Sequence, residues 1–157
     1  EDDTGVSVGH ERGIIDSNIY NDGTGASVLT GGRRFSDSCS TDIFIHMDGQ
    51  EVFKFAVKSV PTAIETLLHN NNMDVNDVDK FILHQANVRI IESVAKRLKA
   101  DKDKFPVNLN EYGNTSSASI PILLDELNRN GSLKQGEKLV LAGFGAGLSW
   151  GSILLVW

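Results

Sequence analysis

Three short segments of the sequence combine residue types that could do chemistry. HQAN occupies residues 84–87 directly after a compact apolar run, and YGNTSSA occupies residues 112–118. The third segment, GFGAG at 143–147, lies between two apolar runs. A neutral imidazole has an ordinary pKa of about 6.5, so His84 could donate a hydrogen bond or move a proton. Glycines between two strands let the backbone approach a ligand and direct N–H groups at it, as in an oxyanion site.

Each segment also has a purely structural interpretation. His84 could cap the following helix or satisfy a buried carbonyl. Residues 112–118 could be a turn glycine followed by a polar helix start, with Asn, Thr or Ser as the N-cap. The glycine-rich segment could be a plain β-hairpin turn. It does not suit a phosphate loop, because such a loop leads into a helix and here another strand is expected to follow.

The elements that would position these segments follow from periodicity. Short β-like runs separated by Gly, Asn, Asp and Ser are expected at 13–20, 25–29 and 41–47. Apolar residues at three- and four-residue spacing predict a helix from about residue 50 to the three asparagines at 70–72, with a kink or short break before Pro61. The run Phe81-Ile82-Leu83 predicts a buried strand that ends at His84.

The rest of the chain continues the alternation of helix and strand. A second helix is expected over about 87–100, with Ile90, Ile91, Val94, Ala95 and Leu98 on one side and Arg89 and Lys96 on the other. A loop over 108–114 precedes a third helix that ends at Asn130 and Gly131. Two apolar strands, 138–142 and 152–157, are joined by the glycine-rich segment 143–151. This order predicts a layered α/β domain.

Composition limits the function classes. The chain has 157 residues, 40% of them hydrophobic and 23% charged, which suits one domain with a core. A net charge of −6 argues against a general nucleic-acid or anionic-membrane binder. No apolar run approaches the about 20 residues of a membrane span, and no signal peptide is recognised.

The single cysteine, Cys39, excludes an internal disulfide, and no Cys/His spacing suits zinc, so we expect no metal site and a reducing, cytoplasmic setting. Cys39 has no neighbouring base and no helix start to lower its pKa, so an ordinary free thiol is expected. His10, His46 and His69 lie in no motif, and we expect them to be solvated or partly packed.

Together and in this order, HQAN at 84–87, YGNTSSAS at 112–119 and GFGAGLSWG at 143–151 resemble the C-terminal half of a β-ketoacyl-[acyl-carrier-protein] synthase III, a condensing enzyme of the thiolase superfamily. The resemblance includes MDGQEVFK at 47–54 and covers most of the chain from about residue 13. A histidine–asparagine pair separates this group from the elongating condensing enzymes, which use two histidines. Chalcone-type synthases and hydroxymethylglutaryl-CoA synthases match less well around the histidine.

The resemblance implies a thiolase-like α/β fold, in which two related βαβαβαββ halves pack into a five-layered αβαβα structure. Residues 1–157 would form a single C-terminal domain, without the N-terminal half that carries the acyl-accepting cysteine and without the first strand of its own half. Because the sequence opens with Glu1 rather than Met, we expect a chain processed or cut from a longer one. We also expect it to be inactive alone and to expose a wide apolar face that another chain covers.

The activity implied by the resemblance is a decarboxylating condensation that initiates fatty acid synthesis. An acyl group from acyl-CoA, most simply acetyl-CoA, is carried on the cysteine, and malonyl-acyl carrier protein loses carbon dioxide to give the attacking enolate. His84 and Asn114 would donate hydrogen bonds to the malonyl thioester oxygen, and Ala146 would offer its N–H to the acyl thioester oxygen. Each such donor is typically worth about 3 kcal/mol of barrier. CoA and phosphopantetheine thioesters are then substrates, and no cofactor is expected.

The resemblance also assigns binding positions. Phe144 would line the cavity near the nucleophile, and the pantetheine tunnel or acyl pocket would include Met47, Gly49, Phe53, Ala86 and Asn87. Arg89, Lys96 and Arg97 match the basic patch on which acyl carrier protein docks. Residues 84–104 hold six basic and three acidic side chains, a local charge of +3, which would steer an acidic partner, although a solvated helix face is the simpler explanation of such charges.

Several alternatives stay open. A non-catalytic pantetheine or carrier-protein binding module would keep the fold and the patch, but it would need neither His84 nor Asn114. A related condensing enzyme of a secondary-metabolite pathway would keep both. The acyl-chain preference is left open, because the acyl pocket would be built largely from the other half and from contacts in a homodimer of the full enzyme.

Overall fold

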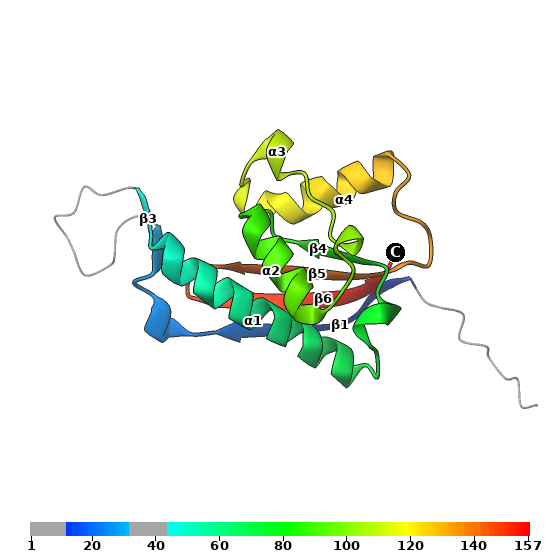
Figure 1. The fold of residues 1–157 in the computed structure, drawn as a ribbon, viewed down its shortest axis with the longest axis horizontal. Helices are drawn as coiled ribbons and strands as arrows, with labels where there is room; N and C mark the ends of the chain where they lie inside the picture. The colour runs from blue at the N-terminus through cyan, green and yellow to red at the C-terminus, as the bar shows by residue number, and fades with distance from the viewer. Residues whose placement is uncertain (1–11, 32–43) are drawn as a thin grey trace, which may run out of the picture.

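The computed structural model describes residues 12–31 and 44–157. Cys39 and His10 lie outside the described residues, so the expectations for them stay predictions. The helices and strands, in chain order, are β1 (Gly13–Asn21), β2 (Leu29–Gly31), β3 (Ile45–Met47), α1 (Gly49–Asn70), β4 (Lys80–Leu83), α2 (Val88–Leu98), α3 (Leu109–Tyr112), α4 (Ser119–Arg129), β5 (Lys138–Gly145) and β6 (Ser149–Val156) (Figure 1).

The main sheet has the strand order β1-β6-β5-β4. β4 and β5 are parallel, with Phe81 opposite Val140, whereas β6 is antiparallel to both β5 and β1. The short strands β2 and β3 form a separate antiparallel pair. Because β4 and β5 are parallel, their carboxyl ends lie at the same edge of the sheet, where α/β proteins usually place ligands.

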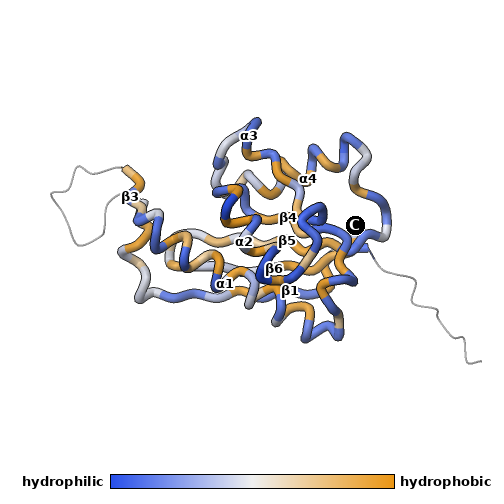
Figure 2. Tube along the Cα trace, in the orientation of Figure 1, coloured by the Kyte–Doolittle hydropathy of each residue, from blue (hydrophilic) through white to orange (hydrophobic). Residues whose placement is uncertain are grey.

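Two helices, α1 and α2, cover one face of the sheet. Alternate strand residues such as Phe81, Val140 and Leu154 point toward them and join one buried cluster with the apolar sides of both helices. The apolar side predicted for α2 is confirmed, since all five of its expected core residues are buried. Figure 2 shows the hydrophobic residues concentrated along the strands and along the sides of the helices that pack on them.

The opposite face is covered over β4 and β5 by α4. Ile82 and Leu139, which alternate with the residues of the first cluster, pack there against Leu123 and Leu127. Over β1 this face is open, and Ile15 and Ile19 are 50% and 78% exposed. The expected exposed apolar surface is therefore present on this chain.

A strand does precede α1, so the expectation that the first strand is missing is wrong. β1 pairs along its length with β6 and forms the edge of the sheet. The position between α2 and α4, where a βαβαβαββ unit would have its third strand, instead holds only α3 and short 3-10 turns among the described residues.

Of the kink or short break expected before Pro61, the break is wrong, because α1 runs unbroken through it, and the kink stays a prediction. Proline has no N–H, so it leaves the carbonyl of Val57, four residues earlier, without its helical partner. Arg97 of α2 supplies that partner, since its Nη1 donates to the Val57 carbonyl at 3.4 Å. Pro61 itself is buried in the interior side of α1.

Two expectations near the start of the chain need correction. Residues 25–28 do not form a strand, because Asp22 accepts a hydrogen bond from the Thr24 amide at 2.9 Å and caps a 3-10 turn over Gly23–Gly25, and β2 begins only at Leu29. Of the strand expected at 41–47, Ile45–Met47 is a strand and Phe44 is not, and residues 41–43 lie outside the described ranges. The loop expected at 108–114 contains the single turn α3.

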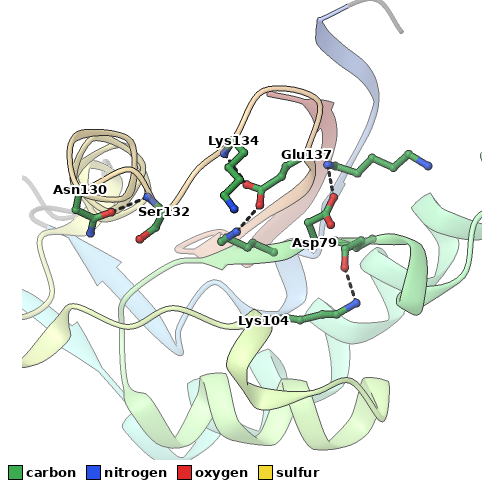
Figure 3. A network of polar contacts seen from close by, with 9 residues as sticks. Asp79, Lys104, Asn130, Ser132, Lys134 and Glu137 are labelled. Carbon is green, nitrogen blue, oxygen red and sulfur yellow. Dashed lines mark hydrogen bonds and ion pairs between the residues drawn. The ribbon is translucent and has the colours of Figure 1, made fainter.

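A polar network holds the edge of the sheet at which β4 and β5 begin (Figure 3). Asp79 accepts from the amide of Lys138 at 2.8 Å, and Lys80 pairs with Glu137 at 2.8 Å. Lys104 reaches the backbone carbonyl just before β4, at 2.6 Å. Burial by itself raises the pKa of the Glu137 carboxyl, but its hydrogen bonds outweigh burial, so the pKa lies below its ordinary value. This network is structural and lies at the edge opposite the carboxyl ends of the parallel strands.

Candidate active site

His84 lies at the carboxyl end of β4, where the HQAN segment meets the β5–β6 hairpin. Its amide donates to the carbonyl of Ala142 at 2.9 Å, which extends the β4–β5 pairing by one residue. Its ring packs edge-on against Phe144, with centroids 5.3 Å apart and planes at 69°. The Nδ1 atom is 2.6 Å from the hydroxyl oxygen of Ser119, the first residue of α4. The tertiary fold therefore joins the HQAN segment directly to the glycine-rich segment and to Ser119, the last residue of YGNTSSAS.

The interpretation of His84 as a helix cap is wrong. Asn87 is the N-cap of α2, and its side-chain oxygen accepts from the Arg89 amide at 2.8 Å. Burial lowers the pKa of the His84 imidazole below its ordinary value. A lowered pKa keeps the ring neutral near pH 7, and a neutral ring in this position is suited to donate a hydrogen bond.

Asn114 lies in an exposed turn between α3 and α4. Its side-chain oxygen accepts from the Ser116 amide at 2.9 Å, which forms the turn that leads into α4. No hydrogen bond joins Asn114 to His84 within the described residues. The two are linked through the chain instead, because Ser119, five residues after Asn114, contacts the His84 ring. The N-cap alternative is not realised by a side chain at α4, whose N-cap is Ala118 without a side-chain bond.

Ala146 occupies the turn between β5 and β6. The glycine-rich linker expected over 143–151 is mostly strand, and only residues 146–148 separate β5 from β6. The hairpin interpretation is thus confirmed. The amide of Ala146 has no backbone acceptor among the described residues, so it is free to donate to a ligand. Gly147 has φ of +140°, and a Cβ there would collide with Ser149, so the turn requires glycine.

A hollow of about 500 Å³ opens between the amino ends of α1 and α2. Its lining residues are Gly49, Gln50, Phe53, Lys54, Asn87 and Arg89. Three of the five residues expected along the pantetheine tunnel are therefore brought together, beside one residue of the expected basic patch. Met47 and Ala86 do not line it: Met47 is 61% exposed on β3, and Ala86 packs at the margin of the core. Gln50 and Lys54 were not predicted, although both lie in the segment 47–54 that carried the resemblance.

The basic residues on and after α2 have different roles. Arg89, Lys96 and Arg97 are exposed, as expected for a docking surface. Arg97 also completes the hydrogen bonding of α1, and Lys104 belongs to the network at the other edge of the sheet. The patch available to a partner therefore consists mainly of Arg89 and Lys96, because Lys54, at the same hollow as Arg89, is paired with Glu51 at 2.7 Å.

An aromatic row next to His84 was missed by the sequence reasoning. Phe144 contacts Phe55 edge-on at 6.3 Å, Phe55 contacts Trp150 at 5.2 Å, and Trp150 stacks on Tyr20 at 5.5 Å. Because β1, β5, β6 and α1 supply these rings, no local pattern could have shown it. The row fixes the position of Phe144 against the imidazole.

Other features of the described chain lie away from this site. A second hollow of about 430 Å³, bordered by Tyr112, Ile122, Asp125, Glu126, Arg129 and Asn130, contains none of the predicted site residues. Within residues 12–31 and 44–157, no group of three or more His, Cys, Asp or Glu side chains gathers as a metal site would need. None of the helices in these ranges has the length and apolar character required to cross a bilayer.

Known proteins match this chain over the regions that build the site. Residues 68–157 match the family model of the 3-oxoacyl-[acyl-carrier-protein (ACP)] synthase III C terminal. The β-ketoacyl-[acyl-carrier-protein] synthase III of Clostridium tetani is 44% identical over 162 residues, covering 94% of this chain and 48% of that protein. The chain spans about half the length of the curated relatives it matches.

Solved structures share the fold as well. The β-ketoacyl-[acyl carrier protein] synthase III of Thermus thermophilus superposes with a TM-score of 0.85 at 38% identity, over 93% of this chain and 46% of that one. A priming β-ketosynthase of a polyketide biosynthetic pathway gives a TM-score of 0.81 at 35% identity, over 92% of this chain and 45% of that one.

Proposed function

Because the chain belongs to the 3-oxoacyl-[acyl-carrier-protein] synthase III family, we propose that it supplies the enolate-stabilising half of a decarboxylating condensing enzyme. The observation that carries the proposal is the contact of His84 with Phe144 and Ser119 at the carboxyl end of β4. It gathers a neutral hydrogen-bond donor, the free amide of the Ala146 turn and the segment that carries Asn114 at one edge of the sheet.

The proposed reaction has three chemical steps. A cysteine thiolate on the N-terminal half attacks the acyl-CoA carbonyl, and CoA thiolate leaves. In malonyl-acyl carrier protein, the bond between the α-carbon and the carboxylate then breaks, carbon dioxide departs, and the electron pair forms an enolate. The α-carbon of the enolate attacks the acyl thioester, a carbon–carbon bond forms, and the cysteine thiolate leaves.

The residues of this chain act on the charge that develops during these steps. His84 and Asn114 donate hydrogen bonds to the malonyl thioester oxygen, where the enolate charge appears. The Ala146 amide donates to the acyl thioester oxygen, where the tetrahedral intermediate carries its charge. Donors fixed in place before the reaction stabilise such charge without reorganising, at about 3 kcal/mol each. No cofactor enters this scheme.

The hollow between α1 and α2 suits the pantetheine arm. It is open, and Phe53, Gly49 and Asn87 give it a mixed apolar and polar lining. Arg89 lies at the same hollow, so a phosphate or an acidic carrier protein at its mouth would meet positive charge, whereas the charge of Lys54 there is paired with Glu51 at 2.7 Å. We assign acyl carrier protein to this surface.

Reversing charge with Arg89→Glu and Lys96→Glu should lower kcat/KM for malonyl-acyl carrier protein more than for malonyl-CoA. Lys134→Glu, at the opposite edge of the sheet, is the control and should lower neither value.

The experiment that tests the proposed function combines this chain with the N-terminal half of the Clostridium tetani synthase. Transfer of labelled acetyl from acetyl-CoA to protein and release of carbon dioxide from malonyl-acyl carrier protein are measured for each half and for the mixture. The two halves of the Clostridium tetani enzyme, mixed in the same way, show that such halves can assemble. A covalent chimera of the same two segments provides a second format.

We expect acetyl transfer and carbon dioxide release in the mixture or the chimera, and neither activity in this chain alone. Activity of this chain alone would contradict the need for a cysteine on another half. A folded chimera that binds acyl carrier protein but releases no carbon dioxide would favour the alternative, a non-catalytic binding module. The presence of both His84 and Asn114 favours the enzyme, because a binding module requires neither.

The pathway served by the full enzyme is a separate matter. We propose initiation of fatty acid synthesis with acetyl-CoA, because the family model and the curated relatives carry the synthase III description. The similarity to a priming synthase of a polyketide pathway makes priming with another acyl group the second candidate. In the chimera, the rates with acetyl-CoA and with branched and longer acyl-CoA are compared. The comparison tests how the residues that this chain contributes to the acyl pocket select between the two candidates.

A further inference from the structure

The hydroxyl of Ser119 lies between two groups of the HQAN segment. Its oxygen is 2.6 Å from the Nδ1 atom of His84 and 3.3 Å from the backbone nitrogen of Gln85. Ser119 is only 2% exposed, although it begins α4, whose neighbouring residues at 116–118 are exposed. A buried hydroxyl must satisfy its hydrogen bonds within the protein, so these two contacts define what it can do.

Counting donors and acceptors fixes the direction of the bond to His84. A serine hydroxyl has one proton and can accept at its lone pairs. The Gln85 amide can only donate, so it uses a lone pair of the Ser119 oxygen. Within the described residues, Nδ1 of His84 is the one acceptor in hydrogen-bond contact with the Ser119 hydroxyl. If Nδ1 carried a proton itself, the Ser119 proton would be buried without an acceptor, at the cost of an unmade hydrogen bond.

We propose that Ser119 is a positioning residue that donates to Nδ1 of His84 and thereby holds the imidazole in the tautomer with its proton on Nε2. The tautomer is a property of this chain, and its use in decarboxylation rests on the proposed function. With the proton on Nε2, the ring presents a donor to a substrate oxygen. With the proton on Nδ1, the same ring would present a lone pair and repel the enolate.

The surroundings hold this arrangement rigid. Gln85, which is 1% exposed, donates from Nε2 to the carbonyl of Leu83 at 2.8 Å and accepts from the Asn108 amide at 3.2 Å. These two side-chain bonds hold Gln85 in place, so that its backbone N–H points at the Ser119 oxygen. Phe144 packs edge-on against the imidazole and limits its rotation.

Charge does not decide the protonation of the ring. The lowered pKa of His84 is caused by burial alone. The charged residues on the elements that carry or contact the ring are Lys80 on β4, Lys138 on β5, and Asp125, Glu126 and Arg129 on α4, and none of them contributes to this shift. The neutral ring is therefore the relevant form near pH 7, and which nitrogen holds its proton is set by hydrogen bonding.

The first test needs no activity. In the uniformly ¹⁵N-labelled 157-residue chain, the ring nitrogens of His84, assigned by their loss in His84→Gln, report the tautomer directly. We expect Nε2 to be protonated and Nδ1 unprotonated at pH 7.5. A protonated Nδ1 would overturn the proposal. In Ser119→Ala, a mixture of both tautomers is expected, whereas Ser119→Thr, which keeps the hydroxyl, and the exposed control Ser117→Ala should keep the wild-type tautomer.

The second test uses the mixture or chimera described above. Ser119→Ala should lower decarboxylation severalfold at pH 7.5, less than loss of the donor itself, because part of the ring population keeps its proton on Nε2, while acyl transfer to the cysteine should stay unchanged. As the pH falls through the His84 pKa, the imidazolium regains a proton on Nε2 in the variant. The ratio of variant to wild-type decarboxylation should therefore rise toward one at low pH.

The outcomes separate the two proposals. If Ser119→Ala lowers decarboxylation and acyl transfer equally at every pH, Ser119 has a merely structural role and the positioning role is overturned. The opposite outcome is also distinguishable. If His84 holds its proton on Nε2 only when residue 119 carries a hydroxyl, the positioning role stands. If the wild-type mixture and chimera then release no carbon dioxide, the proposed function fails.

Discussion

Replacing His84 with alanine separates two consequences that the structure assigns to one side chain. The imidazole donates to the malonyl thioester oxygen in the proposed reaction, and it also fills the space between Ser119 and Phe144. The first role affects a single chemical step. The second affects the stability of the whole fold, and therefore every step alike.

The magnitudes of the two effects follow from the contacts. Loss of one preorganised donor costs about 3 kcal/mol of barrier, or about 10²-fold in the decarboxylation rate. Loss of the edge-on contact with Phe144 costs about 1 kcal/mol, and leaving the Ser119 hydroxyl without an acceptor costs about 1 kcal/mol more. We therefore expect His84→Ala to lower the free energy of unfolding by about 2 kcal/mol, which leaves most of the protein folded if the wild type has ordinary stability.

The assay measures three quantities on the chimera with the Clostridium tetani N-terminal half. These are acetyl transfer to the cysteine, carbon dioxide release from malonyl-acyl carrier protein, and urea unfolding. We expect carbon dioxide release to fall about 10²-fold while acetyl transfer falls less than threefold. His69→Ala is the matched control, because His69 is exposed at the end of α1, and it should change all three quantities little.

The result that would refute the reasoning is a parallel loss of both steps in a variant that remains folded. Such a loss would mean that His84 supports the site as a whole and does not act on the enolate. Unchanged carbon dioxide release in folded His84→Ala would refute the donor role outright.

Three further predictions concern other residues. Asn114→Ala should lower carbon dioxide release about 10²-fold and leave acetyl transfer unchanged, because its Nδ2 is the second donor to the enolate; a loss confined to acetyl transfer would contradict this. Glu137→Gln should lower the free energy of unfolding by about 1 kcal/mol at pH 7. The Glu137 pKa is depressed in the folded state, so its contribution is present above the ordinary value of 4.5 and is lost as the pH falls through the folded pKa; urea titrations should show a smaller difference between variant and wild type at pH 3 than at pH 7. Gly151→Ala should cost about 2 kcal/mol or more in urea unfolding, because its Cβ would lie 2.5 Å from the Asn18 carbonyl oxygen, whereas Gly145→Ala, with open space at its Cβ, should cost much less.

The helices and central strands could be predicted because their signals are local. The apolar spacing of α2 and the run Phe81-Ile82-Leu83 each identify an element and its buried side. The end of α4 could be predicted for the same reason, since Gly131 adopts the positive φ expected of a helix C-terminus. The predicted break at Pro61 failed because the cost of proline depends on whether its freed carbonyl finds another donor, and Arg97 lies 40 residues from Val57 in sequence.

The sequence by itself determined which residue types are present at the site and the ends of the elements that carry them. It placed His84 after a buried strand and Ala146 in a hairpin turn, and the motifs carried the family resemblance. Only the tertiary structure decided which groups meet. Ser119 lies 35 residues from His84 along the chain, and the hollow joins Phe53 of α1 to Arg89 of α2. The physical reason is that parallel strands bring distant segments to one edge of a sheet, where contacts depend on packing and register and not on sequence spacing.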